Sequence, residues 1–478
     1  MFTNNIAAVH LGVFAVSRNN FLPLLSLDAL EQVKRVLKLE DDVIIYFGKT
    51  LIDSENAVKR ALAEAEKNHC NAAVILLGNF GAEGPETIFA KKFNGPVMYA
   101  GIAEDAQTSL YNGRRDTYCG MLNCSYNLNL RNCHAYIPPK PIGTAEEVAK
   151  MVEIFIPIAR SVLSLRQLKI IVFGSRPNDF FACNAPILGL YNMGIEIEEN
   201  SEMDLFLAYQ AHEYDSRIAE VVASMEHELG HPKYPDLLPK MAQYELTLLD
   251  WAQEHKGICE YVAFANKCWP AFREVFHFLP CYVHSRLAAR GIPVGCETDV
   301  YGALSQYAAM CLSGSPSALL DINNAPPKDL AEQLCKTVSG AQRSDFFIGF
   351  HCGNTAMPLM EHAELRYKFD RKNPDAPETG TEASRGTLEG RMRDGEITFF
   401  RMHADKAGSM ISYVQEGRIL PIELHTYGCY GTFHVAGMQE FYRNVLIEHA
   451  FPHHCAVTYG RYKEQFLALC QFFEIKNM

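Results

Sequence analysis

Two carboxylates, Glu297 and Asp321, have residue types and positions suited to catalysis. An apolar run at residues 292–296 ends at Glu297, and a second at residues 318–320 ends at Asp321. Two acidic side chains directed at one point can bind a hard divalent cation, act as an acid/base pair, or do both. This pair is therefore the first candidate catalytic site in the chain.

The segment between the two carboxylates predicts a helix that joins two strands. Thr298 or Asp299 can cap the helix, apolar residues follow at helical spacing, and Gly314 is placed to end it. A strand, helix and strand in succession predict a crossover with parallel strands. Because parallel neighbours lie about 5 Å apart, we expect both carboxylates at one crevice, at the carboxyl ends of the strands.

Histidines in two later segments can complete such a site. His351 follows the apolar strand expected at 346–350, whereas His453 and His454 precede the strand expected at 455–459. Adjacent residues on an extended stretch point to opposite sides, so only one of the pair is expected at a metal, and the other is free for substrate or structure. Oxygen and imidazole donors without thiolates suit Mn²⁺, Mg²⁺ or Co²⁺, which can hold neighbouring sugar hydroxyls and polarise a carbonyl.

A different metal motif occurs at residues 227–231, whose sequence HELGH matches the zinc-peptidase pattern HExxH. In that pattern both histidines lie one turn apart on a helix. Here Pro232 biases His231 away from helical geometry, and Gly230 is a typical helix terminator. We therefore interpret the segment as the end of a helix.

Composition limits the class of protein. The chain has 478 residues, which predicts two to four domains, and a net charge of −12, which argues against nucleic acid or an anionic membrane as the main partner. No segment approaches 18 consecutive apolar residues, and the N-terminus lacks a basic leader region, so we expect a cytoplasmic protein. The 15 cysteines form no CxxC pair, which favours buried reduced thiols.

The order of predicted elements indicates an α/β fold with two doubly wound parallel-sheet (Rossmann-like) domains, followed by a mostly antiparallel β domain. We expect an N-terminal α/β domain at 1–165 and a central α/β domain at 166–344 that carries the carboxylates. The C-terminal β domain at 345–478 should end in a helix. Residues 370–396 are polar and lack apolar periodicity, so a long loop is predicted there.

Five stretches in this order resemble the L-fucose isomerase and L-arabinose isomerase superfamily. The most specific point of similarity is the interval of 24 residues between Glu297 and Asp321, with Gly302 and Ala303 in the helix between them. The stretches are residues 170–177, 297–303, 320–321, 386–390 and 451–454.

This resemblance implies a Mn²⁺-dependent aldose–ketose isomerase that works through an ene-diol. Carried over to this sequence, Glu297 and Asp321 become metal ligands and the catalytic acid/base pair, and His454 becomes the imidazole ligand. His351 takes the place of a further histidine ligand of the arabinose isomerase branch.

Substrate and partners follow from the same resemblance. A fucose- or arabinose-type sugar is expected, with Arg176, His453 and Asn354 as substrate-binding residues. The family assembly is a homo-oligomer, a trimer or a hexamer, whose active sites are lined by a neighbouring subunit's N-terminal domain. The alternative is a non-catalytic sugar-binding protein on the same scaffold, against which the two intact carboxylates argue.

Overall fold

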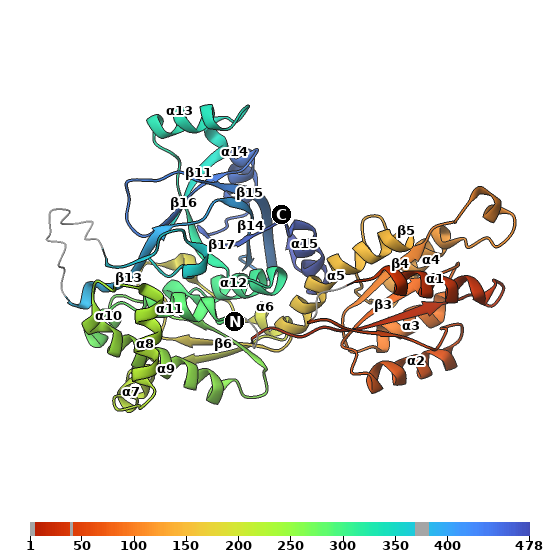
Figure 1. Ribbon diagram of the computed structural model, residues 1–478, viewed down its shortest axis with the longest axis horizontal. Helices are drawn as coiled ribbons and strands as arrows, with labels where there is room; N and C mark the ends of the chain where they lie inside the picture. Colours follow the sequence, from red (N-terminus) through yellow and green to blue (C-terminus); the bar gives the residue numbers. More distant parts are fainter. Residues whose placement is uncertain (1–4, 39–41, 369–381) are drawn as a thin grey trace. The chain divides into compact units, whose positions relative to one another are not determined.

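The computed structural model describes residues 5–38, 42–368 and 382–478, and it divides the chain into two compact units (Figure 1). The smaller unit comprises Ala7–Leu163 together with Glu464–Phe473. The larger unit comprises Ser164–Lys463 and a short segment from each end of the chain. All the predicted site residues belong to the larger unit.

The smaller unit is built on a parallel sheet in the order β2-β1-β3-β4-β5. β3 and β4 are buried at every position, as expected for central strands covered on both faces. The strands are β1 (His10–Val16), β2 (Ile44–Phe47), β3 (Ala72–Leu77), β4 (Val97–Ile102) and β5 (Ile142–Gly143). The helices are α1 (Pro23–Val36), α2 (Glu55–Lys67), α3 (Glu83–Lys92), α4 (Thr117–Leu130), α5 (Ala145–Leu165) and the late α15 (Lys463–Phe472).

The larger unit begins with a second parallel sheet in the order β7-β6-β8-β9. Its strands are β6 (Leu168–Phe173), β7 (Glu196–Asn200), β8 (Tyr261–Ala265) and β9 (Val294–Gly295). The helices of this part are α6 (Leu188–Asn192), α7 (Glu202–Ala211), α8 (Ile218–Leu229), α9 (Leu238–His255), α10 (Phe272–Phe276) and α11 (Cys281–Ala289).

A mostly antiparallel sheet forms the rest of the larger unit, in the order β12-β13-β16-β11-β10-β17-β14-β15-β18. A further pairing of β15 with β16 closes β16, β11, β10, β17, β14 and β15 into an antiparallel barrel. The strands are β10 (Ala318–Asn324), β11 (Phe346–His351), β12 (Glu364–Tyr367), β13 (Arg385–Arg391), β14 (Gly395–Ala404), β15 (Met410–Leu420), β16 (Cys429–His434), β17 (His454–Tyr459) and β18 (Lys476–Asn477). Two parallel sheets and this barrel confirm the predicted fold class.

Helix α12 (Val300–Ser313) packs between the small parallel sheet and the barrel (Figure 1). It contacts β8 and β9 on one side and β14 and β17 on the other, and its residues from Val300 to Leu312 are all buried. The predicted ends are confirmed: Asp299 accepts a hydrogen bond from the Gly302 amide at 2.9 Å, and Gly314 ends the helix with a φ of 63°. The N-terminus of α12 is therefore held between the two sheets.

The predicted parallel crossover is wrong. β9 joins the small sheet, parallel to β8, whereas β10 joins the barrel, antiparallel to β11 and β17. The physical reason is that α12 is mostly apolar and is buried around its whole circumference, so it needs a sheet on each side rather than one sheet beneath it. The two carboxylates therefore reach the site from different sheets.

The predicted long loop at 370–396 is also corrected. β13 pairs antiparallel with β12, with Leu388 opposite Leu365, and β14 begins at Gly395. β13 contains a single large apolar side chain, Leu388, so its sequence lacks the alternation that signals a strand, and pairing with β12 and β16 defines it instead. Residues 370–381 of the predicted loop lie outside the described residues.

The HELGH segment ends α8, as its proline and glycine predict. Gly230 follows the helix with a φ of 69°, and the side chains of His227 and His231 are exposed. Glu228 forms an ion pair with the buried Arg286 of α11 rather than facing a metal. The segment therefore serves helix packing, and the peptidase interpretation is not supported.

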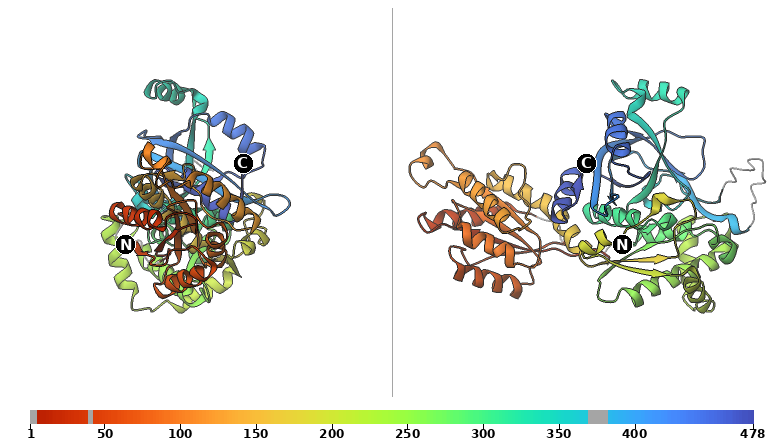
Figure 2. Two further views of the ribbon diagram at one scale, coloured as in Figure 1. Left: turned by 90° about the vertical axis from the view of Figure 1, so that its right-hand side faces the viewer. Right: turned by 180° about the vertical axis from the view of Figure 1, so that it is seen from behind.

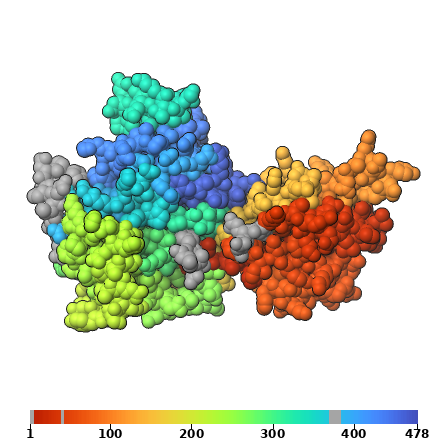
Figure 3. Space-filling view, in the orientation of Figure 1, coloured from red at the N-terminus to blue at the C-terminus, as the bar shows by residue number. Residues whose placement is uncertain are grey.

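Helix α13 (Lys328–Thr337) and the polypeptide around it stand out from the barrel (Figures 2 and 3). Leu334 packs there against Phe346 and Leu420 in a small apolar cluster. This cluster is separate from the main barrel core, in which Leu320, Phe399 and Val457 are buried.

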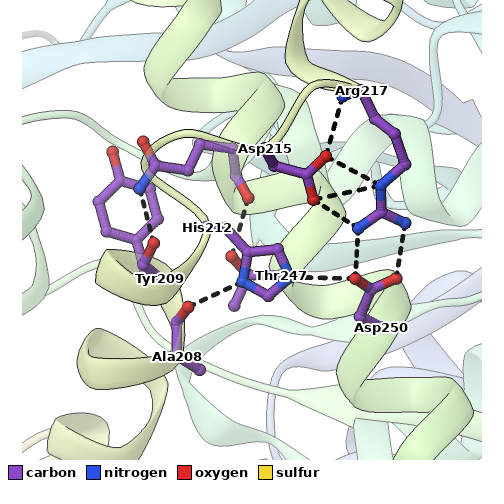
Figure 4. A network of polar contacts seen from close by, with 8 residues as sticks. Ala208, Tyr209, His212, Asp215, Arg217, Thr247 and Asp250 are labelled. Carbon is purple, nitrogen blue, oxygen red and sulfur yellow. Dashed lines mark hydrogen bonds and ion pairs between the residues drawn. The ribbon is translucent and has the colours of Figure 1, made fainter.

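A polar network ties the helices α7, α8 and α9 together (Figure 4). His212 follows α7, and its Nδ1 and Nε2 lie 2.8 Å from the Ala208 carbonyl oxygen and 3.0 Å from Asp250 Oδ2. Arg217 bonds both Asp250 and Asp215, which leaves no need for a cation among these carboxylates. Burial alone would lower the pKa of His212, but these hydrogen bonds outweigh it and raise the pKa, because both ring nitrogens face acceptors.

This network predicts a pH-dependent stability. The folded pKa of His212 is raised, so its contribution is fully present below an unfolded pKa of about 6.5 and is lost as the pH rises through the folded value. His212→Gln should therefore lower the unfolding temperature more at pH 5.5 than at pH 9. The free-energy difference should be about 1 kcal/mol or less, because solvent screens the pair.

Calorimetry at both pH values checks this expectation. The matched control is His425→Gln, since the His425 side chain is exposed on a loop. An equal loss of stability at both pH values for the His212 variant would contradict the argument.

Candidate active site

Asp321 and His454 lie directly opposite each other on β10 and β17. Opposed residues in an antiparallel pair project to the same face, and His454 Nε2 lies 3.4 Å from Asp321 Oδ1. On the other side of β10, Phe350 of β11 is opposite Asp321, and His351 ends that strand. Strand register therefore places three of the predicted site residues at one end of the barrel.

Glu297 reaches the same place from a short turn between β9 and α12. Its φ and ψ are 62° and 25°, and Thr298 also has a positive φ of 59°. A hydrogen bond from the Thr298 amide to the Asn266 carbonyl at 3.0 Å holds this turn against the end of β8. The result is that Glu297 Oε2 lies 3.4 Å from His454 Nε2.

The remaining histidines border the same carboxylates. Donor atoms of Glu297, His453 and His454 lie within 4.8 Å of one another, as do those of Asp321, His351 and His454. Both adjacent histidines therefore lie beside the carboxylates, and the expectation that only one of them binds a metal, with the other free for substrate or structure, stays a prediction. His453 precedes the first residue of β17, so the alternation of an extended strand does not apply to it.

The donor set fits a hard divalent cation. His454 Nε2 and His351 Nδ1 are buried and have no hydrogen-bond partner among the described residues, although such atoms are normally paired. The contacts of His454 Nε2 with both carboxylates, at 3.4 Å, are longer than normal hydrogen bonds. Imidazole nitrogens and carboxylate oxygens without a thiolate are the donors that Mn²⁺, Mg²⁺ or Co²⁺ accept.

Charges in the site are strongly coupled. Burial would raise the pKa of Glu297, but the adjacent imidazole of His454 outweighs it and lowers the pKa. Burial would lower the pKa of His454, yet the hydrogen bond to Asp299 and the nearby side chains of Cys183 and Glu297 raise it well above the usual value. A proton or a cation is therefore favoured between the imidazole and the carboxylates. The pKa of His351 and that of His453 are lowered, chiefly by burial.

The sequence does not predict that Asp299 and Arg401 belong to this site. The position of Asp299 predicts only a helix cap, and nothing in the sequence assigns a function to Arg401. Both are buried, at 1% and 0% exposure, and Arg401 donates to Asp299 at 2.8 and 2.9 Å. Burial would raise the pKa of Asp299, but the charge of Arg401 and the bond from His454 hold it well below its usual range. An arginine inside the apolar run 397–402 is the signal that points to this contact.

The other two predicted substrate-binding residues, Arg176 and Asn354, do not belong to the groups of candidate metal ligands. Among the described residues, Arg176 bonds Asn184 Oδ1 at 2.7 Å and lies over the Phe181 ring at 3.9 Å. Asn354 is buried, and its Oδ1 has no hydrogen-bond partner within the described parts of the chain. The loop of Arg176 reaches the site through Phe180, whose ring centroid is 5.6 Å from that of His453.

A cavity of about 410 Å³ opens beside these residues. His453 and Ile322, the neighbour of Asp321, line it together with His403 and mostly apolar side chains, including Phe181 and Tyr442. Its volume lies in the range of small-molecule sites, about 300–1,000 Å³. Burial lowers the pKa of His403 to about 4, so its ring is neutral at neutral pH.

Two further observations concern the whole chain. Within the described ranges, no helix has both the length and the apolar character needed to cross a membrane. Among solved structures, a galactofuranose binding protein shares 10% identity over 64% of this chain and 90% of its own, with a TM-score of 0.16. That likeness bears on neither fold nor function.

Comparison with known families matches both ends of the chain. Residues 12–166 match the N-terminal domain of fucose/sulfoquinovose isomerase, and residues 349–478 match the C-terminal domain of L-fucose isomerase.

Curated relatives agree with these domain matches. A sulfoquinovose isomerase of Priestia megaterium is 23% identical over 325 residues, which is 67% of this chain and 66% of the relative. Another, of Clostridium sp. (strain MSTE9), is 24% identical over 347 residues, 69% of each chain. The match covers slightly less than two thirds of the Priestia protein. With both domain matches, these relatives show that the chain belongs to the L-fucose isomerase-like family.

Proposed function

We propose that this protein is a metal-dependent aldose–ketose isomerase that acts on a fucose- or arabinose-type sugar through an ene-diol intermediate. The observation that carries the proposal is the convergence of Glu297 and Asp321, from two different sheets, on the unpaired Nε2 of His454. Membership of the family and the names of the curated relatives support the same reaction class.

The residues that would hold the cation are Glu297, Asp321 and His454, with His351 as a further ligand. Mn²⁺ is the proposed metal, and Mg²⁺ or Co²⁺ would suit the same donors. When bound, a divalent cation polarises the sugar carbonyl and stabilises negative charge on its oxygens.

Proton transfer is assigned to the two carboxylates. One removes the proton from C2 of the open-chain aldose; the electron pair of that bond forms the C1–C2 double bond while the C1–O1 π electrons move to O1, which is protonated to give the ene-diol. The O2 hydroxyl proton is then lost, the C2–O2 double bond forms, and the electron pair of the C1–C2 double bond takes up a proton at C1, which yields the ketose. Glu297 and Asp321 reach the site from different sheets, so they can act from two sides of the substrate.

Substrate contacts are assigned to residues around the cavity. His453 is 37% exposed in its side chain and lines the cavity, so it can bond a hydroxyl of the sugar. Asn354 has a free amide oxygen for the same purpose among the described residues. Arg176 is proposed to contact the substrate beyond Phe181, on which it stacks.

The acid/base assignment predicts a large loss of activity in Glu297→Gln and in Asp321→Asn. Each variant should lower kcat/KM by about 100-fold or more, since each removes a proton-transferring group. The measurement is ketose formation from a panel of aldoses by protein that has been stripped of metal and reloaded with Mn²⁺.

The control for this assay is Glu260→Gln, which removes an exposed carboxylate outside the site. Full activity in the two site variants would refute the mechanism. Sugar binding without any turnover by the wild type would indicate the non-catalytic binding protein instead.

The cavity predicts a preference for uncharged sugars. Among the described residues that line it there is no lysine or arginine, and the one cationic side chain assigned to the substrate, Arg176, is already held by Asn184 and the Phe181 ring, so the sulfonate of a sugar such as sulfoquinovose would be poorly neutralised there. We expect kcat/KM for L-fucose, L-arabinose or D-arabinose to exceed that for sulfoquinovose by about 10-fold or more.

A designed charge tests the same cavity. Tyr442 lines the cavity and is 48% exposed. Tyr442→Arg should therefore bring kcat/KM for sulfoquinovose closer to kcat/KM for the neutral sugars. Val275→Arg, at a 40% exposed position that does not line the cavity, is the control. If the wild type turns over sulfoquinovose faster than the neutral sugars, residues outside this cavity determine the substrate preference.

We also propose a cytoplasmic homo-oligomer, a trimer or a hexamer. On α4, the large side chains of Tyr118, Leu122, Tyr126 and Leu130 are 61–76% exposed at intervals of four residues, so they share one helix face. Contiguous exposed apolar surface of this kind is typical of protein interfaces, and a second copy of this chain is the proposed partner.

Light scattering on the intact protein tests this assembly. Leu122→Glu should shift the mass toward the monomer, because a buried charge in an apolar interface is costly. Lys59→Glu, an exposed change of charge on α2 in the same unit, should leave the mass unchanged. A wild-type protein that is active as a monomer would contradict the proposal.

A further inference from the structure

We infer that Arg401 and Asp299 act together as positioning residues, which fix the orientation of His454 and thereby set the affinity of the site for its cation. This inference rests on the proposed function. It concerns residues that touch neither the sugar nor the cation, and it is carried by buried contacts around one imidazole ring.

Asp299 fixes the orientation of the His454 imidazole ring. His454 Nδ1 lies 2.8 Å from Asp299 Oδ2. A carboxylate only accepts hydrogen bonds, so the proton of the imidazole is held on Nδ1. The other nitrogen, Nε2, then faces Glu297 and Asp321 at 3.4 Å. A carboxylate behind a histidine fixes which nitrogen is available and in which direction it points.

Asp299 is itself held in place by hydrogen bonds to both of its carboxylate oxygens. Oδ1 accepts from the Gly302 amide at 2.9 Å and from Arg401 Nη2 at 2.9 Å, while Oδ2 accepts from Arg401 Nη1 at 2.8 Å as well as from His454. With both oxygens engaged, Asp299 is not itself a free ligand. The fully bonded Asp299 carboxylate differs from the opposite side of His454, where Nε2 has no hydrogen-bond partner among the described residues.

Arg401 holds His454 in two ways, one direct and one through Asp299. Besides its bidentate bond to Asp299, Arg401 Nη1 approaches the His454 carbonyl oxygen at 3.3 Å. Arg401 lies on β14, which pairs with β17 through Phe400 and Ala456. One guanidinium therefore holds His454 at its backbone directly and at its ring through Asp299.

The chemistry of Arg401 indicates a positioning role rather than a contribution to stability alone. A buried ion pair loses the hydration of both charges, and well-packed apolar residues in its place often give equal stability. Arg401 and Asp299 are buried at 0% and 1% exposure, yet their bonds are directed at a proposed ligand. The planar guanidinium also matches a carboxylate in a way that the lysine ammonium cannot.

Arg401→Lys and Asp299→Asn test the inference. Lysine keeps the positive charge but loses the bidentate geometry, and asparagine keeps an oxygen for the Gly302 amide but loses the charge. Titration calorimetry of the metal-free protein with Mn²⁺ should show a Kd raised by about 10- to 100-fold in each variant. The visible spectrum of the Co²⁺-loaded variants should also differ from that of the wild type, since it reports the ligand geometry.

The matched control is Glu245→Gln in a second buried ion pair of the same unit. Glu245 and Arg286 have 0% and 3% exposed side chains, and Arg286 Nε donates to Glu245 at 2.6 Å. This variant should lower the unfolding temperature but leave the Mn²⁺ affinity and the Co²⁺ spectrum unchanged. It therefore separates a loss of stability from a loss of positioning.

The outcomes distinguish this inference from the proposed function. Wild-type Mn²⁺ affinity and an unaltered Co²⁺ spectrum in Arg401→Lys would overturn the positioning role, even if the enzyme isomerises sugars. A wild type that neither binds Mn²⁺ nor forms ketose would refute the proposed function, and the positioning role with it. If Asp299→Asn does not fold, Arg401→Lys alone decides, because it retains the buried charge.

Discussion

The buried carboxylate of Asp299 joins three parts of the larger unit at one point. It caps α12 through Gly302, pairs with Arg401 of β14, and accepts a hydrogen bond from His454 of β17. Because α12 packs between the small parallel sheet and the barrel, this single group fixes the helix end relative to both. Two of the candidate ligands depend on that junction, since Glu297 precedes Asp299 by two residues and His454 bonds it directly.

Strain in the backbone appears at the same junction. Glu297 and Thr298 both have positive φ values, although neither is glycine, and such residues cost roughly 1–3 kcal/mol each. They persist because the Thr298 amide is bonded to Asn266 and the Thr298 side chain is buried at 4% exposure. A relaxed turn would carry the Glu297 carboxylate elsewhere, so the strain is coupled to its approach to His454.

Local patterns in the sequence predict the elements well, but not which sheet each strand joins. The cap at Asp299, the end at Gly314 and the apolar strands could be predicted because each depends on a few neighbouring residues. β9, with two residues, carries almost no pattern of its own, and its sheet is decided by packing across α12. Arg401 within an apolar strand signals a buried partner, yet that partner is 102 residues away, and no local spacing identifies it.

The two carboxylates have different kinds of support, and this bears on how the site can work. Asp321 and His454 are held by strand register in a closed barrel, in which a shift of one residue would turn both side chains to the other face. Glu297 is held instead by a strained turn, which the bond from the Thr298 amide to the Asn266 carbonyl fixes in place. The bond from His454 to Asp299 links the rigid side to the turn only two residues from Glu297. The strained turn that carries Glu297 is therefore anchored, through Asp299 at the start of α12, to the paired strands that hold Asp321 and His454.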